Sequence, residues 1–201
     1  MQKYCNIVKN KLNMLIRNME KNAPDFVVDP KRDFVRKSEL SFSKTIRFIL
    51  GMGSRTLGKE LMEFYDFNPK MVSVSAIVQR RSKILPAAFQ YLFHEFNNEF
   101  SQTNFFHGYR LYAVDGSDIH IPTIPDDKET FYRANDDSKG YNLMHLNALY
   151  DLMNRRYIDA VLQDSRNENE HSALISMAKN VKCDSIIVAD RGYEAYNNIA
   201  H

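Results

Sequence analysis

Two short apolar runs, each followed at once by an aspartate, constrain the fold of this chain more than any other feature. Residues 111–114 precede Asp115, and residues 186–189 precede Asp190. Apolar runs of this length, rich in Val, Ile and Leu, indicate buried strands. A carboxylate at the end of a buried strand needs a proton, a partner or a metal ion, because an unpaired buried charge is very costly. The two aspartates are therefore the first candidates for a functional site.

The pattern between the two runs predicts a mixed sheet. A loop over residues 119–139 leads to a strand over 141–153, a tight turn and a third strand over 156–163, which predicts an antiparallel hairpin. A helix follows, with Asn167 as its expected N-cap and Glu170 three residues later, as in a capping box. A helical crossover normally returns the chain parallel to a strand of the same sheet. We therefore expect strand 186–189 to lie beside strand 111–114.

That arrangement would place Asp115 and Asp190 at neighbouring strand ends, about 5 Å apart. Two carboxylates at this distance repel each other unless something shares them. Carboxylates suit Mg²⁺ or Mn²⁺, and such ions support phosphodiester chemistry by activating a water or a 3′-hydroxyl. The alternative is that each aspartate only begins a turn after its strand, since Asp-Gly and Asp-Arg-Gly are common turn formers. Spacing alone leaves both interpretations open.

The N-terminal half has a helical and basic pattern. Residues 1–108 hold 17 Lys and Arg against 10 Asp and Glu, whereas residues 109–201 hold 10 against 15. Helices are expected over 1–22, over 41–50, through 57–65, from a Ser73 or Ser75 cap to 84, and over 86–100, with a short charged helix over 31–40. Two helices followed by a capped basic helix resemble a helix-turn-helix element. The candidate DNA contacts are Lys44, Arg47, Arg55, Arg80, Arg81 and Lys83; the alternative is an ordinary solvated basic face.

Composition excludes several other classes of protein. Two cysteines are too few for a disulfide framework and have no zinc-binding spacing. The N-terminus lacks the apolar region of a secretory signal, and no run approaches the roughly 20 apolar residues of a membrane helix. We therefore expect a cytoplasmic protein without a membrane partner.

Several motifs of the second half together resemble one family, the DDE transposases of bacterial insertion sequences. The motifs are Asp115-Gly116-Ser117, Ile121-Pro122, His145 through Tyr150-Asp151, Asn169-Glu170-His171 and Asp190-Arg191-Gly192-Tyr193-Glu194-Ala195-Tyr196-Asn197. The resemblance implies a ribonuclease H-like catalytic domain that uses Mg²⁺ (or Mn²⁺) to cleave and transfer DNA strands at terminal inverted repeats. It implies that Asp115 and Asp190 are catalytic metal ligands, and that Arg191 and Tyr193 flank them and touch phosphate, or else pack the turn.

The expected fold class is α+β/α/β. A helical DNA-binding domain over 1–108 precedes an incomplete ribonuclease H-like mixed sheet with helices over 109–201. The resemblance also requires a third acid, a Glu in a Tyr-x-x-Arg-x-x-x-Glu motif, and the 201 residues do not contain that motif. We therefore expect an N-terminal portion of a transposase in which catalysis is lost. The alternatives are a non-catalytic DNA-binding regulator, acting as a homo-oligomer or with full-length transposase, and a decayed gene remnant.

Overall fold

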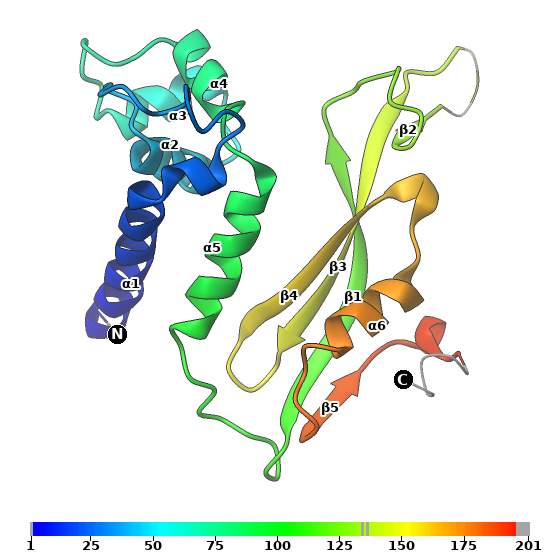
Figure 1. Cartoon of the computed structure of the whole chain (residues 1–201). Coiled ribbons are helices and arrows are strands. Elements are labelled where there is room, and N and C mark those ends of the chain that lie inside the picture. Colours follow the sequence, from blue (N-terminus) through cyan, green and yellow to red (C-terminus); the bar gives the residue numbers. More distant parts are fainter. Residues whose placement is uncertain (1, 134, 136, 196–201) are drawn as a thin grey trace. The chain divides into compact units, whose positions relative to one another are not determined.

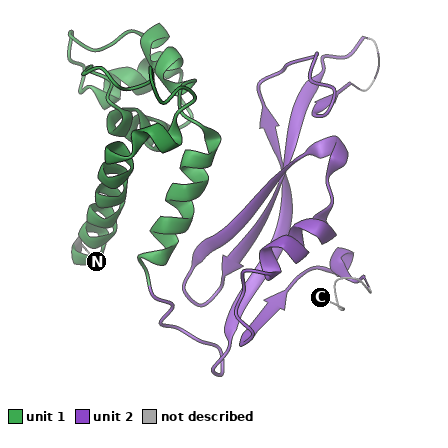
Figure 2. Ribbon diagram, in the orientation of Figure 1, with its two compact units in different colours: residues 1–100 green, residues 101–201 purple. Residues whose placement is uncertain are grey.

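The chain folds into two compact units, residues 1–100 and residues 101–201 (Figure 2). The computed structural model describes residues 2–133, 135 and 137–195, so Tyr196 and Asn197 of the last motif lie outside the described residues. The division falls earlier than the boundary expected after Gly108. The backbones of Phe106 and Tyr109 exchange two hydrogen bonds of 2.8 and 2.9 Å within the second unit, directly before its first strand.

The first unit is helical (Figure 1). Its elements are α1 (Gln2–Lys21), the 3₁₀ turn η1 (Ala23–Phe26), α2 (Phe42–Gly51), α3 (Leu57–Phe64), α4 (Val74–Arg81) and α5 (Pro86–Asn98). Apolar side chains at helical spacing meet in two clusters, because each helix must bury one stripe. The first cluster joins α1, α2 and α5 through Ile16, Ile46 and Leu92. The second joins α2, α3 and α4 through Phe48, Leu61 and Ile77.

Serine caps fix where α2 and α4 begin. Ser41 accepts a hydrogen bond from the Lys44 backbone N–H, and Ser73 accepts one from the Ala76 backbone N–H. Each cap satisfies a donor that the first helical turn leaves unpaired. Of the two serines considered for α4, Ser73 is therefore the N-cap.

The prediction of a short helix over residues 31–40 is wrong. The chain forms turns and bends there. The Asp33 backbone N–H donates to the Asp29 carbonyl, but Phe34 then adopts a left-handed φ of 56°, which ends any helical path. The Phe34 ring instead packs edge-on against Phe42, with ring centres 5.6 Å apart. The packing of Phe34 therefore favours an irregular path over the helix that the charged composition of the segment predicts.

The second unit is a five-stranded mixed sheet with one α-helix among its described residues. Its elements are β1 (Arg110–Ile121), β2 (Phe131–Tyr132), β3 (Tyr141–Asp151), β4 (Arg156–Asp164), η2 (Ser165–Asn167), α6 (Glu170–Ala178), β5 (Ser185–Val188) and η3 (Arg191–Tyr193). β1 is central: it pairs antiparallel with β3 and parallel with β5 (Figure 1). β3 pairs in turn with β4 and β2. The hairpin and the crossover therefore form as expected, and a mixed sheet with helices is consistent with a ribonuclease H-like fold.

The core of the second unit lies between the sheet and α6. Val114 of β1 and Leu149 of β3 are register partners, so their side chains share a face. Met177 of α6 and Tyr193 of η3 pack on these residues. The helix begins later than expected: Asn169, not Asn167, is the N-cap and accepts the Ser172 N–H at 2.9 Å. Residues 165–167 form the turn η2 instead.

The first strand is much longer than the apolar run that predicts it. β1 continues through Ile121, although a loop was expected from residue 119. Seven consecutive residue pairs with β3 hold this polar extension in the sheet, from Asp115↔Ala148 to Ile121↔Asn142. Asp115 therefore lies within β1 and not after it. Its position nevertheless matches the carboxyl end of β5, which pairs only as far as Ala113↔Val188.

Candidate active site and basic groove

Asp115 of β1 and Asp190, two residues beyond the end of β5, occupy equivalent positions along a pair of parallel strands. Asp115 is two residues beyond Ala113, and Asp190 is two residues beyond Val188, the partner of Ala113. The Gly116 backbone N–H donates to Asp115 Oδ1 at 2.9 Å, and the Gly192 N–H donates to Asp190 Oδ1 at 2.8 Å. Both side chains are exposed. Each carboxylate thus has one oxygen oriented by the backbone and a second oxygen available to a ligand.

The pKa of the Tyr193 hydroxyl reflects its burial and the negative charge around it. Burial, followed by the charges of Glu170, Asp115 and Asp190, raises the pKa of the Tyr193 hydroxyl to about 12. A carboxylate near a phenol opposes its ionisation, because it destabilises a second negative charge. Glu170, at the first turn of α6, is therefore a third carboxylate of this region. Glu170 belongs to the Asn169-Glu170-His171 motif. Its closeness to the two aspartates depends on the packing of α6 on the sheet, which the motif alone does not predict.

A cluster of one histidine and three carboxylates lies close by. Asp118 of β1 and His145 of β3 are register partners, and His145 Nδ1 lies 2.9 Å from Asp118 Oδ1 and 3.2 Å from Glu168 Oε2. On the other side of the ring, Nε2 lies 3.2 Å from Glu170 Oε1. Burial opposes the charged imidazole, but the carboxylates of Asp118, Glu168 and Glu170 outweigh it, so the pKa of His145 is raised.

Gly116 is required by this packing. A Cβ atom there would lie 2.5 Å from His145 Nε2 and would also collide with the Glu170 carboxylate. Any larger residue beside Asp115 would therefore push the histidine or the glutamate away. Glycine in the Asp-Gly-Ser motif thus has a steric reason in this fold, in addition to its frequency in turns.

The cations expected to contact DNA are largely engaged within the first unit. Lys44 pairs with Glu39, Arg55 pairs with Glu63, and Lys83 pairs with Asp33. Arg47 Nε donates to Asn13 Oδ1 at 3.0 Å. The other two candidate DNA contacts are Arg80 and Arg81. The Arg80 guanidinium lies 5.0 Å from the centre of the Phe34 ring, and Arg81 is exposed.

Tyr193, expected beside Arg191 at the DNA, is only 6% exposed and belongs to the core. Arg191 is exposed at the start of η3. The structure thus gives the tyrosine a packing position and leaves the arginine accessible.

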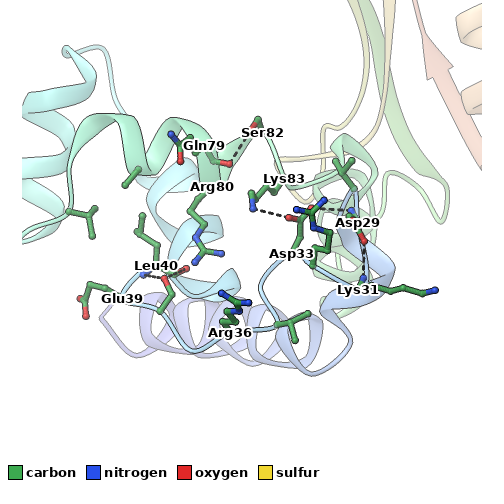
Figure 3. A pocket seen from close by; sticks show the side chains of 16 residues that line it. Asp29, Lys31, Asp33, Arg36, Glu39, Leu40, Gln79, Arg80, Ser82 and Lys83 are labelled. Atoms are coloured by element: carbon green, nitrogen blue, oxygen red, sulfur yellow. Dashed lines mark hydrogen bonds and ion pairs between the residues drawn. The ribbon is translucent and has the colours of Figure 1, made fainter.

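A polar groove of about 840 Å³ lies between α4 and the irregular segment before α2 (Figure 3). Its cationic lining residues are Lys31, Arg32, Arg36, Arg80 and Lys83. Its acids are Asp29, Asp33 and Glu39, and the last two already pair with Lys83 and Lys44. Three of these cations, at positions 31, 32 and 36, were not recognised from the sequence, because the segment was expected to be an independent helix.

The Asp33–Lys83 pair provides a test of the groove's architecture. Lys83 Nζ lies 2.9 Å from Asp33 Oδ1, and the Asp29 N–H donates to the same carboxylate. The Lys83 hydrogen bond, opposed by burial and assisted by the Asp29 N–H, lowers the pKa of Asp33. Asp33→Asn should lower the free energy of unfolding by about 1 kcal/mol at neutral pH, because it removes the charged partner of Lys83. The effect is no larger because Lys83 is partly exposed to water, which weakens a charged hydrogen bond.

The pH dependence of this effect follows from the lowered pKa. The contribution of Asp33 is present above its unfolded-state pKa and is lost as the pH falls through its folded-state pKa. Chemical denaturation of wild type and Asp33→Asn should therefore differ at neutral pH and converge in acid. The matched control is Asp25→Asn, at an exposed position. A stability difference between wild type and Asp33→Asn that does not change with pH would contradict the assignment.

Comparison with known proteins finds a family that the second unit resembles. The family model described as "Transposase DDE domain" matches residues 106–201, which begin just before β1 and include Asp115, Asp190 and the histidine cluster. No curated protein and no solved structure matches the chain. Among the described residues, no helix is long and apolar enough to cross a membrane. The match covers nearly all of the second unit, which is therefore similar to the transposase DDE domain family.

Proposed function

We propose that this chain is part of an insertion-sequence transposase in which Asp115 and Asp190 hold a divalent cation, Mg²⁺ or Mn²⁺, at the DNA. The observation that carries the proposal is the parallel pairing of β1 with β5, which aligns the two aspartates at the end of β5. The residues fit such an ion: both side chains are exposed carboxylates, the donors that Mg²⁺ and Mn²⁺ prefer. Burial is the main cause of the raised pKa of Tyr193, and the charges of Glu170, Asp115 and Asp190, which a cation would offset, add to it.

The roles of the individual residues follow from their contacts. The N–H groups of Gly116 and Gly192 orient one oxygen of Asp115 and of Asp190. A bound divalent cation would activate a water or a 3′-hydroxyl for attack on a phosphodiester. Arg191, exposed directly after Asp190, would contact a phosphate of the DNA strand.

The metal pair is tested by binding of Mn²⁺ to the 201-residue chain, followed through the electron paramagnetic resonance signal of the free ion. Replacing both aspartates, with Asp115→Asn and Asp190→Asn, should weaken binding at least about tenfold, because both carboxylate charges are removed. Asp126→Asn, an exposed carboxylate of the loop before β2, should leave binding unchanged. Equal Mn²⁺ affinity of the double variant and wild type would overturn the assignment.

The groove of the first unit supports binding to DNA. Lys31, Arg32 and Arg36 line it together with Arg80, and Figure 3 shows the Arg36 and Arg80 side chains at the groove. Clustered arginine and lysine side chains bind the phosphate backbone and release counterions, which makes binding steeply dependent on salt. We therefore propose this groove, together with the exposed Arg81, as the DNA-binding surface, in place of the paired Lys44, Arg55 and Lys83.

This proposal predicts how charge removal changes DNA affinity. Arg36→Ala with Arg80→Ala should weaken binding of duplex DNA and reduce the slope of log affinity against log salt by about one for each phosphate that the variant no longer neutralises. The measurement is fluorescence anisotropy with a duplex carrying terminal inverted repeats of an insertion sequence and with a scrambled duplex. Lys182→Ala, an exposed cation of the second unit, is the control. Binding that is insensitive to salt, or unchanged in the double variant, would exclude the groove.

A further inference from the structure

We propose that Asp118, His145 and Glu168 form a second divalent-metal site, suited to a transition ion such as Zn²⁺. One oxygen of each carboxylate and one ring nitrogen of His145 all lie within 4.8 Å of one another. The site shares no ligand with the Asp115–Asp190 pair. It would join strands β1 and β3 to the segment that leads into α6.

The sheet places two of the three ligands without any contribution from loops. Asp118 and His145 are direct partners in the β1–β3 register, so their side chains stand side by side on one face. Glu168 follows η2 and reaches the same ring nitrogen. Metal–ligand bonds of about 2.0 to 2.2 Å would separate tetrahedral ligand atoms by about 3.4 Å. The distances of 2.9 and 3.2 Å from His145 Nδ1 to the two carboxylates are close to this value.

The charges of the cluster favour a cation. Nδ1 can carry one proton, yet two carboxylate oxygens face it. Within the described part of the chain, the ion pairs of Asp118, Glu168 and Glu170 are with His145 alone. One imidazolium would leave a net charge of two negative on the four groups. A divalent ion between Asp118, Glu168 and the neutral imidazole would satisfy both carboxylates and would leave a net charge of only one negative on the four groups.

The opposite side of the ring has the arrangement found around metal-binding histidines. Such histidines donate their second ring N–H to a carboxylate, which fixes the ring and makes the coordinating nitrogen more basic. Glu170 Oε1 lies 3.2 Å from Nε2 and can accept that hydrogen bond. His145 is only 7% exposed, so its ring is held by packing as well. Gly116 leaves the space that the ring and Glu170 occupy.

The donor set selects the class of ion. One imidazole nitrogen with two carboxylate oxygens is a ligand set of Zn²⁺ and related transition ions, whereas Mg²⁺ prefers oxygen ligands alone. Three protein ligands would leave a fourth position for water. Because the ligands come from β1, β3 and the entry to α6, a bound ion would cross-link three elements that otherwise meet through packing and hydrogen bonds.

The test uses Co²⁺ as a spectroscopic substitute for Zn²⁺ in the untagged 201-residue chain. We expect one Co²⁺ to give visible absorption and to be displaced by Zn²⁺. Asp118→Asn and Glu168→Gln should each weaken binding at least about tenfold, since removal of even outer carboxylates costs 10- to 100-fold. Both positions are exposed, so these variants should fold, which circular dichroism checks. His145→Gln, at a buried position, should abolish the signal.

Two controls separate this site from other carboxylates. Asp126→Asn should leave the visible absorption of Co²⁺ at the histidine site unchanged, and so should the double variant of Asp115 and Asp190, even if that variant loses a separate ion at the aspartate pair. Wild-type affinity in Asp118→Asn and Glu168→Gln would overturn the proposal. Disappearance of the Co²⁺ signal in the Asp115 and Asp190 double variant would also overturn it, because the ion would then lie at the other pair.

Discussion

Leu149→Ala is expected to lower the free energy of unfolding of the second unit by about 2 to 5 kcal/mol. Leu149 is fully buried near the C-terminal end of β3, where it packs with Val114, Met177 and Tyr193. Truncation removes apolar packing and leaves a cavity that a sheet covered by a helix cannot easily close. Hydrogen exchange of β3 amides under mild denaturant would measure the effect in this unit alone.

The matched control for this prediction is Leu162→Ala. Leu162 lies on the neighbouring strand β4 and is 58% exposed, so its truncation should change stability by no more than about 0.5 kcal/mol. Equal destabilisation by the two leucine variants would mean that the buried face of the sheet is not the one that α6 covers.

Asp151→Ala should be nearly as damaging, at about 2 to 4 kcal/mol, although it removes no apolar side chain. The Asp151 carboxylate is 1% exposed at the end of β3. It accepts hydrogen bonds from the Met153 and Asn154 backbone N–H groups and from the side-chain amides of Asn154 and Gln102. Removal of this acceptor leaves several partly buried donors without their partner, and each loses the free energy of its hydrogen bond to a charged group. Equilibrium urea denaturation would measure the change in the free energy of unfolding.

A conservative variant tests the cause of this destabilisation. Asp151→Asn keeps one acceptor oxygen and should be less destabilised than Asp151→Ala, whereas Asp126→Ala, at an exposed position, should be almost unaffected. Identical free energies of unfolding for the asparagine and alanine variants would assign the effect to charge and not to hydrogen bonding.

Features of the fold that depend on local patterns could be predicted from the sequence. Apolar spacing predicts the main helices of the first unit and the β3–β4 hairpin, because each element buries one face. The helix before β5 requires a crossover, and chirality rules then place β5 beside β1. The alignment of Asp115 with Asp190 follows from these two steps.

Features that depend on residues distant in sequence could not be predicted. The polar end of β1 has the composition of a loop, and only its seven pairs with β3, from Asp115↔Ala148 to Ile121↔Asn142, make it a strand. The Asp118–His145 pair depends on that register, and so it was not recognised. Residues 31–40 have helix-compatible composition, but packing of Phe34 and the pairing of Asp33 with Lys83 decide their path. Intramolecular partners likewise remove Lys44 and Arg55 from the set of available cations.

The parallel β1–β5 pair has a consequence for the order of folding. Antiparallel β3 and β4 are joined by a short turn and can pair as soon as both are synthesised, whereas β5 is separated from β1 in sequence by the hairpin and α6. Pairings of such high sequence separation carry a large loop-closure cost and form slowly. We therefore expect Asp115 and Asp190 to come together last, so that a growing or partly folded chain has no aligned aspartate pair. Binding of the proposed divalent ion would then require that this unit has folded completely.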